Sequence, residues 1–433
     1  MKIKIKRGLT IPLIGVPEGK VQSFPLPNEV ALELSAFEGL TLTLLKKEGE
    51  EVKVGEPIVG DKKCPKRVFV SPGSGKIKEV LRGAKRRILA VVIETDQKQT
   101  PFRSEKGAME TLAEGGLLPH IELRPCNRIA HPQIQPEVIF VKAIESAPFA
   151  PPPELEVEGM EDYFAVGLEG LESLAPIHLV HREGSCCSSF TSPSCGKVHS
   201  ATGPHPIGNA SVHIAALHPI KTVDQAVWVL TVSDVIAIGM WLKEGRYYTE
   251  KVVGVGGEGI PENRRGYFRV NRGCSLNGLV EGGGDSVRII SGDPLCGMSS
   301  FGFLGFKHNV VCAIPEKDEG QEFLPFLKLT RKGYTASKAY FFRKRKAGFT
   351  TSQHGEERAF VDGTIYDAVM PLKIEVMPLI KHLLSEDVEK GGALGLLEVA
   401  PEDFALPAFV CPSKIDMIQI VKQGLKRYAE QYT

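Results

Sequence analysis

Alternating apolar and polar residues, broken at short intervals by glycine and proline, fill the stretch from Leu40 to Thr95. The runs LTLTLL, EVKV, RVFV and RRILAVVIET have the two-residue period of strands, and the segments between them are typical of turns. The pattern therefore predicts a small all-β barrel over residues 31–97, preceded by an N-terminal segment at residues 1–30.

Beyond residue 97 the pattern changes to nearly continuous apolar runs that alternate with segments of helical spacing. PEVIFVKAIE, IHLVH and AVWVLTV are typical of strands buried on both faces. MEDYFAVGLEGLESLA and DVIAIGMWLKEG favour helices, and Gly245 is a plausible stop for the second one. The order strand, helix, strand predicts a central α/β domain at residues 98–246.

The remainder of the chain divides into a glycine-dense part and a part rich in helix formers. Glycine and β-branched residues predict a compact β-rich module at residues 247–330, and residues 331–433 are expected to be mainly helical. The last helix should begin at a capping-box-like Ser413 and Asp416. Its predicted apolar face consists of Ile415, Ile418, Val421, Leu425 and Tyr428.

Composition narrows the class of protein. The 433 residues are 42% hydrophobic and 24% charged, which is ordinary for a globular protein with more than one core. A net charge of +1 gives no global field for nucleic acid, so we expect no nucleic-acid partner. The start KIKIKRG lacks the apolar core of a signal peptide, and no apolar run reaches the about 20 residues of a transmembrane helix. We expect neither feature.

The nine cysteines do not have the spacing of a metal site, because the chain contains no C-x-x-C pair. Cys411 stands in VCPSK, which resembles the end of a ferredoxin motif without its other cysteines. We therefore expect no metal site and no iron–sulfur cluster in this chain.

The stretch around Lys62 and Lys63 resembles a biotinyl or lipoyl carrier domain, with EGEEVKVGEPI and SPGSGKIKEVLRGAKR as its two halves. Such a domain presents a modified lysine at a tight hairpin tip. Here the join reads DKKCPKRV, and Pro65 together with the extra basic residues predicts a longer tip. A barrel without an attached cofactor is favoured, and a prosthetic group on Lys62 or Lys63 is the alternative.

The segment TGPHPIGNASVHIAALHP contains His205, His213 and His218 in a loop with Gly203 and Gly208. Freed backbone amides and a neutral imidazole can hold a carbonyl oxygen, such as that of a quinone. The spacings of eight and five residues disfavour a zinc site on one helical face. His205, Gly208 and His213 are therefore candidates to face a quinone or a partner, with a purely structural loop as the alternative.

Two further motifs resemble binding sites but also have simple structural interpretations. GVGGEG at residues 254–259 superficially matches a dinucleotide-binding loop, but IPEN and the strand-like RRGYFRV follow it instead of a helix, so we reject NAD binding there. The run from Arg343 to Lys346 is either a solvated face or a contact for anionic lipid or an acidic partner.

Nine segments, in order along the chain, carry a family resemblance. They are KIKIKRGLTIPLIGVPE, the barrel with SPGSGKIKEVLRGAKR, RPCNRIAHP with VIFVKAIESAPFAPPPE, GPHPIGNASVHIAALHP, VWVLTVSDVIAIGMWLKEGRYYTEKVVGVGG, RIISGDPLCG, TTSQHGEERAF, YDAVMPLKI and ALGLLEVAPEDFALPAFVCPSK. Together they resemble the A subunits of the Na⁺-translocating NADH:quinone reductases. The resemblance covers essentially the whole chain.

This resemblance implies a multidomain fold that combines α/β and β-rich parts. Its expected pieces are the biotinyl/lipoyl-like barrel, a region similar to the flavin subunit of complex I, a β-grasp module and a helical relic of an iron–sulfur domain. The insert REGSCCSSFTSPSCG, from Arg182 to Gly196, departs from the expected pattern and puts a full central ligand pocket in doubt. A soluble flavoprotein that uses this region is a third interpretation.

The resemblance also implies a function. The complex oxidises NADH, reduces ubiquinone and exports Na⁺, with flavins and iron–sulfur centres in its other subunits. This chain is expected to be a peripheral subunit on the cytoplasmic face of the bacterial inner membrane, with subunits B to F as partners. It would scaffold the complex and help form the quinone site, with no complete active site and no covalent cofactor of its own.

Overall fold

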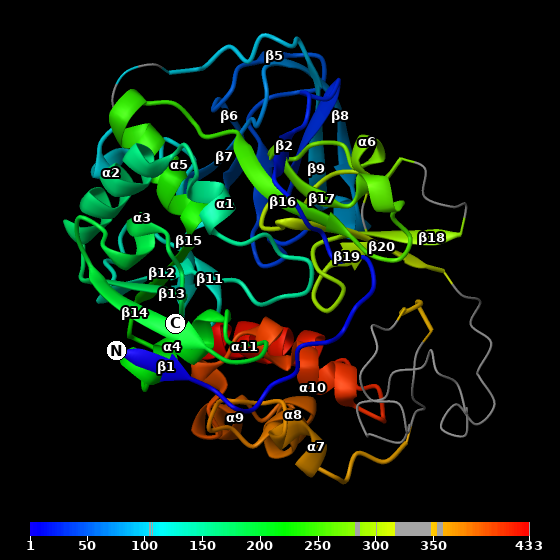
Figure 1. Ribbon diagram of the computed structural model, residues 1–433. Helices are drawn as coiled ribbons and strands as arrows, with labels where there is room; N and C mark the ends of the chain where they lie inside the picture. The colour runs from blue at the N-terminus through cyan, green and yellow to red at the C-terminus, as the bar shows by residue number, and fades with distance from the viewer. Residues whose placement is uncertain are drawn as a thin grey trace.

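The computed structural model describes residues 1–103, 105, 107–281, 286–299, 301–316, 348–352 and 358–432. Within these ranges the protein is a mixed α/β structure with an N-terminal barrel, two larger sheets and a helical C-terminus (Figure 1). The predicted basic run from Arg343 to Lys346 lies outside the described residues. None of the described helices has the length and apolar content needed to cross a bilayer.

The central domain is built on a seven-stranded sheet. Five of its strands are mutually parallel, and the pair β10–β11 begins with an antiparallel step from β15. In spatial order the strands are β1 (Lys2–Lys4), β14 (Lys197–Thr202), β13 (Ile177–Arg182), β12 (Val138–Ala143), β15 (Val227–Thr231), β10 (Glu122–Arg124) and β11 (Arg128–Ile129).

Strand β12 contributes side chains to two hydrophobic cores because it is apolar on both faces, as its continuous apolar run predicted. Ile139 and Val141 pack against one layer of helices, whereas Val138 and Phe140 pack against the other. The first layer contains α1 (Glu154–Val157), α2 (Glu161–Glu172), α3 (Ser188–Thr191) and α5 (Val232–Glu244), with the short helices η2 (Met109–Thr111) and η3 (Leu118–His120) nearby.

The second layer consists of α4 (Ala210–Leu217) and the C-terminal helices, among which α11 lies against the sheet domain (Figure 1). The C-terminal part is helical, as predicted. Its elements are α7 (Thr364–Asp367), α8 (Val376–Leu384), α9 (Val388–Ala393), η6 (Leu396–Glu398), η7 (Pro401–Phe404), α10 (Ala405–Val410) and α11 (Met417–Tyr432).

The predicted ends of two helices have different outcomes. Gly245 ends α5 in a left-handed conformation with φ of 67°, which confirms its role as a stop. The predicted start of α11 at Ser413 is wrong. The Ser413 hydroxyl donates to the carbonyl oxygen of Ala359 instead, and the Asp416 carboxylate accepts from the backbone N–H of Gln419 at 3.1 Å. Asp416 alone therefore caps the helix.

The N-terminal barrel consists of two sheets around one apolar core. The tip of its β6–β7 hairpin is tight, because Asp61 pairs directly with Cys64 and only Lys62 and Lys63 lie between the strands. The prediction of a longer tip is wrong because β7 is an edge strand, where the position of Pro65 needs no N–H donor toward a neighbouring strand.

One sheet of the barrel contains β3 (Glu29–Glu33), β9 (Ile88–Thr95), β8 (Gly75–Arg82) and β5 (Glu51–Val52), with η1 (Ala84–Arg86) between β8 and β9. The other sheet contains β4 (Leu42–Leu44), β6 (Pro57–Asp61) and β7 (Cys64–Val70).

The β-rich module contains a six-stranded sheet. After GVGGEG the chain passes through the short helix η4 (Glu262–Arg264) into another strand, so the phosphate-binding helix of a dinucleotide loop does not follow. In spatial order the strands are β19 (Met298–Ser299), β18 (Val287–Ser291), β20 (Val310–Pro315), β16 (Glu250–Gly256), β17 (Gly266–Asn271) and β2 (Val21–Ser23), and α6 (Asn277–Val280) lies outside the sheet.

The first residues of the chain link two of these parts. Strand β1 pairs in parallel with β14 of the central sheet, whereas β2 pairs in parallel with β17 of the β-rich module. Between the two strands, Leu9 donates its backbone N–H to the carbonyl oxygen of His205 in the central domain at 2.8 Å. The N-terminal segment therefore fastens the module to the central sheet.

Candidate functional site

The predicted histidine loop leaves the carboxyl end of β14 and ends in α4. His205 is only 6% exposed, and its Nδ1 lies 3.0 Å from the Ser146 hydroxyl. The backbone N–H of Gly208 donates to the same hydroxyl at 2.8 Å. Ser146 follows β12, which lies two strands away from β14 in the sheet, so one side chain from that strand end holds two of the three candidate residues.

Gly208 is required by this close approach. A Cβ atom at this position would lie 2.7 Å from the backbone nitrogen of Ser146 and 2.9 Å from its hydroxyl oxygen. Any larger residue would push the loop away from the end of β12 and break the bond between Gly208 and Ser146. The glycine therefore sets the packing distance between the loop and the sheet.

His213 is on α4 and is fully buried. Its Nε2–H donates to the carbonyl oxygen of Ile207 at 2.7 Å, while Nδ1 has no hydrogen-bond partner among the described residues. Burial lowers the pKa of His213 to about 3 and, together with the charge of Lys142, that of His205 to about 4. Both imidazoles are therefore neutral at physiological pH.

The third histidine of the loop lies apart from these two. His218 is partly exposed and its Nε2 lies 3.5 Å from the carboxylate of Glu137. Across the part of the chain that the structure describes, no three His, Cys, Asp or Glu side chains converge as metal ligands. The structure thus brings His205 and Gly208 together at Ser146, and places His213 behind them in the core. Their contact with a quinone or partner stays a prediction.

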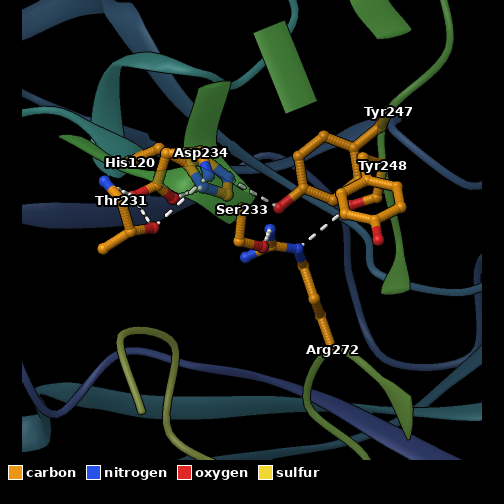
Figure 2. A network of polar contacts seen from close by, with 7 residues as sticks. All are labelled: His120, Thr231, Ser233, Asp234, Tyr247, Tyr248 and Arg272. Atoms are coloured by element: carbon orange, nitrogen blue, oxygen red, sulfur yellow. Dashed lines mark hydrogen bonds and ion pairs between the residues drawn. The ribbon is translucent and has the colours of Figure 1, made fainter. Parts of the chain in front are cut away.

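Sequence reasoning missed a second polar cluster, centred on the start of α5 (Figure 2). The Asp234 carboxylate caps α5 by accepting from the backbone N–H of Thr231 at 3.0 Å and from its hydroxyl at 2.6 Å. It also lies 3.0 Å from Nδ1 of His120, whose Nε2 lies 3.0 Å from the Tyr247 hydroxyl. The T-x-x-D spacing before an apolar run was the available signal, whereas His120 is 114 residues away in the sequence.

Burial sets the protonation of this cluster. It lowers the pKa of His120 to about 4 and raises that of Tyr247 to about 12. Burial alone would raise the pKa of Asp234, but the hydrogen bond from His120 and the nearby cations hold that pKa well below its usual range. The stable arrangement is therefore a neutral imidazole that donates to an ionised carboxylate.

Arg272 extends the cluster into the β-rich module. It follows β17 and donates to the Ser233 hydroxyl at 2.8 Å and to the carbonyl oxygen of Tyr248 at 3.1 Å, as Figure 2 shows. Its guanidinium carbon also lies 5.6 Å from the centre of the Tyr248 ring. Because every member is buried or bonded inside the protein, the cluster joins two domains and does not present a reacting group to solvent.

The two tip lysines of the barrel differ from both clusters in being exposed. The tip is held from below, where the buried carboxylate of Asp61 accepts from Arg67 at 2.7 Å and from the backbone N–H of Lys63 at 3.0 Å. Arg67 also donates to the carbonyl oxygen of Ala130 at 3.2 Å, which anchors the hairpin to the central domain.

Taken together, the fold and these sites define a multidomain α/β protein with an N-terminal barrel-sandwich domain and a helical C-terminus. Its polar clusters hold the domains to one another.

Comparison with known proteins identifies the family. The models described as "NqrA N-terminal barrel-sandwich hybrid domain" and "NqrA second alpha/beta domain" match residues 3–96 and 103–247. The A subunit of the Na(+)-translocating NADH-quinone reductase of Chlamydia caviae is 34% identical, covering 100% of this chain and 97% of the relative. The corresponding subunit of Yersinia pseudotuberculosis serotype O:1b is 33% identical, covering 99% of this chain and 100% of the relative.

The chain belongs to the NqrA family, that of the A subunits of Na(+)-translocating NADH-quinone reductases. Among solved structures, it aligns with an air-oxidised NAD⁺-reducing NiFe hydrogenase at 11% identity and a TM-score of 0.34, over 67% of this chain and 56% of that one. So low a score carries no argument about function. The full-length relatives do not favour the alternative of a carrier module with a modified Lys62 or Lys63.

Proposed function

We propose that this chain is the A subunit of a Na⁺-translocating NADH:quinone reductase. The observation that carries the proposal is the match to relatives of that name along nearly the whole length of both chains. In this role the chain contributes no complete active site of its own, and the oxidoreductase activity belongs to the assembled complex.

The proposed place of the chain is peripheral, at the cytoplasmic face of the bacterial inner membrane. Its partners would be subunits B to F, which carry the NADH site, the flavins and the iron–sulfur centres. The interlocked domains support a scaffolding role, because the N-terminal segment and Arg272 both fasten the β-rich module to the central domain. A rigid body of this kind can hold several subunits in fixed positions.

We further propose that the loop from His205 to His213 contributes to the quinone site through contacts that form in the assembly. The loop backbone suits a quinone carbonyl, which accepts hydrogen bonds without carrying charge, and the neutral imidazoles place no charge beside it. Because His213 is fully buried and His205 is 6% exposed, the loop would act on the quinone through its backbone and through its rigid attachment to Ser146.

The finer description of the domains belongs to the same proposal. The tight two-lysine hairpin supports a barrel of biotinyl/lipoyl type. The ground for proposing that it carries no prosthetic group is the full-length match to A subunits, not the shape of the hairpin. The six-stranded sheet with its outlying helix α6 supports a β-grasp-like origin of the module at residues 247–330, and Cys411 in the helical part supports a relic of an iron–sulfur domain.

Affinity purification of the tagged full-length chain from detergent-solubilised membranes of its source tests the proposal. We expect flavin-bearing membrane subunits in the eluate, together with NADH:quinone reductase activity that Na⁺ stimulates. Recovery of the chain alone, without these subunits, contradicts the proposal. A stoichiometric flavin spectrum from that lone chain would favour the flavoprotein interpretation, and an added mass on the barrel peptide would favour the carrier interpretation.

A further inference from the structure

A cleft of about 430 Å³ opens between the carboxyl ends of β12 and β13. From β12 the chain moves outward to β13 and β14, and then crosses back to β15 on the other side of β12. The reversal of strand order lies between β12 and β15, so the cleft borders it on the β13 side of β12. In open α/β sheets, ligands bind outside the carboxyl ends of the strands. The volume also lies within the roughly 300–1,000 Å³ of small-molecule sites. We call this feature the β12/β13 cleft.

Part of the lining of the β12/β13 cleft is apolar. This part consists of Ile144, Ala150, Pro152, Pro153 and Leu155. Two consecutive proline rings and a leucine form a wall that has no hydrogen-bonding side chain, and proline fixes the backbone of that wall in advance. Such a surface suits the flat, apolar body of a ligand.

The lining also carries four charged side chains, and two of its three carboxylates face a cation. Glu145 lies 3.6 Å from the ammonium of Lys142, and Glu154 accepts from the Ser185 hydroxyl at 2.7 Å. Glu183, also in the lining, is paired with Lys2 at the N-terminus. The three carboxylates of the cleft therefore each have a donor or a cation.

Arg182 is different. One of its terminal nitrogens, Nη2, donates to the carbonyl oxygen of Glu145 at 2.6 Å, which fixes the guanidinium at the rim of the cleft. Among the described residues, no hydrogen bond or ion pair engages its Nε or Nη1, and the side chain is exposed. A guanidinium with a free edge is suited to a carboxylate or phosphate oxygen.

From these observations we propose that the β12/β13 cleft is a binding site for a small organic anion, with its carboxylate or phosphate on Arg182 and its flat apolar body against Pro152, Pro153 and Leu155. The lining of the cleft contains neither Ser146 nor any residue of the histidine loop. The site does not depend on assembly with other subunits, so it can be tested on the full chain alone.

Phenyl phosphate is the probe, because it combines the anion with a flat apolar body. Its saturable binding to the full chain is measured by saturation-transfer NMR on the ring protons. Benzyl alcohol, which keeps the flat body, is measured in the same way, and inorganic phosphate, which keeps only the anion, is measured by its competition with phenyl phosphate. We expect phenyl phosphate to bind at least about tenfold more tightly than either half, because only phenyl phosphate makes both the charged hydrogen bond and the apolar contact.

Cys186 locates the binding. It is the one cysteine of the nine that is exposed, and its thiol lies 3.8 Å from the carbonyl oxygen of Gly184, a residue of the cleft lining. Bound phenyl phosphate should therefore slow alkylation of Cys186 by iodoacetamide, measured by peptide mass spectrometry, with the same concentration dependence as the NMR signal.

The variant Arg182→Gln should weaken phenyl phosphate at least about tenfold and leave benzyl alcohol unchanged, because it removes only the charged edge. Arg288→Gln is the matched control, since Arg288 is an exposed arginine on β18 that pairs with Glu316 outside the cleft. Equal affinity of phenyl phosphate for R182Q and the unmodified chain overturns the proposal. So does the absence of saturable binding to the unmodified chain.

Discussion

The barrel hairpin and the histidine loop both contain residues that suggest a function in the sequence, but the structure exposes those of the hairpin and buries those of the loop. Lys62 and Lys63 are exposed on a tight turn, and the buried Asp61–Arg67 pair holds that turn in place. His205 and His213 look available in a glycine-rich loop, yet both are buried. The comparison teaches that local sequence predicts the shape of a segment better than its exposure.

The two regions differ physically in the contacts that hold their backbones in place. The hairpin is ordered by its own ladder and by one ion pair directly beneath it. The loop is ordered by contacts with elements that are remote in sequence, above all Ser146 after β12. We expect substitutions at these places to show which contacts order each segment. The effect on local stability should decrease from the ion pair beneath the hairpin, through the loop, to the hairpin tip.

The largest effect should follow Arg67→Met. Asp61 is only 2% exposed and would lose its cation, and the hairpin would lose its bond to Ala130. Breaking a buried pair by removing one partner costs about 3–5 kcal/mol. Hydrogen exchange of the β6 and β7 amides should rise accordingly. Arg82→Met, at an exposed arginine of β8, is the control, and equal protection in both variants would show that the pair does not order the hairpin.

A smaller effect should appear in the pH dependence of the loop. The pKa of His205 is about 4 in the folded protein, below the value of 6.5 for a free histidine. Between these values the unfolded chain binds a proton that the folded chain does not, so stability falls as the pH falls from about 6.5 toward 4. His213, with a pKa of about 3, acts in the same direction.

The variant His205→Gln removes one such group. It should reduce the loss of stability between pH 7 and pH 5 by about 2 kcal/mol, measured from the exchange protection of the α4 amides. Glu402 acts in the opposite direction, because burial and the nearby Glu122 raise its pKa to about 7 and favour the folded state in acid. Lys62→Gln should leave the pH curve of α4 unchanged. An unaltered curve in H205Q would mean that His205 is not buried in solution.

The next effect concerns Ser146→Ala. The hydroxyl accepts from Gly208 and bonds with His205, so its loss leaves buried polar groups without a partner, at about 1–3 kcal/mol. We expect faster exchange of the Gly208 amide and of its neighbours. Ser173→Ala, which removes an exposed hydroxyl bonded to Gly170, is the matched control. Unchanged exchange at Gly208 would show that the Ser146 hydroxyl does not hold the loop in place.

The smallest effect should be that of Lys62→Ala with Lys63→Ala. Both side chains are exposed, and surface substitutions away from specific contacts change stability by about 0.5 kcal/mol or less. Co-purification with other subunits should be unaffected, and the intact mass of the unmodified chain should equal its sequence mass. A prosthetic group on either lysine would reverse the interpretation of the barrel.

Much of the architecture follows from the sequence because period and turn chemistry are local. The apolar run Val138–Val141 and the stop at Gly245 predicted β12 and the end of α5, and the strand-like RRGYFRV ruled out a dinucleotide loop. Two local predictions were wrong because tertiary neighbours compete with local signals. Pro65 is tolerated in a tight hairpin since β7 is an edge strand, and Ser413 bonds with Ala359 in preference to the start of α11.

The sequence by itself determined the elements, the class of fold and the family, because each depends on patterns that neighbouring residues carry. Only the tertiary structure decided which side chains meet. His120 reaches Asp234 across 114 residues, and Arg182 frames the β12/β13 cleft with prolines from another loop. The reason is that burial and pairing are set by which strands become neighbours in the sheet, and that order, β14-β13-β12-β15, is not the order of the chain.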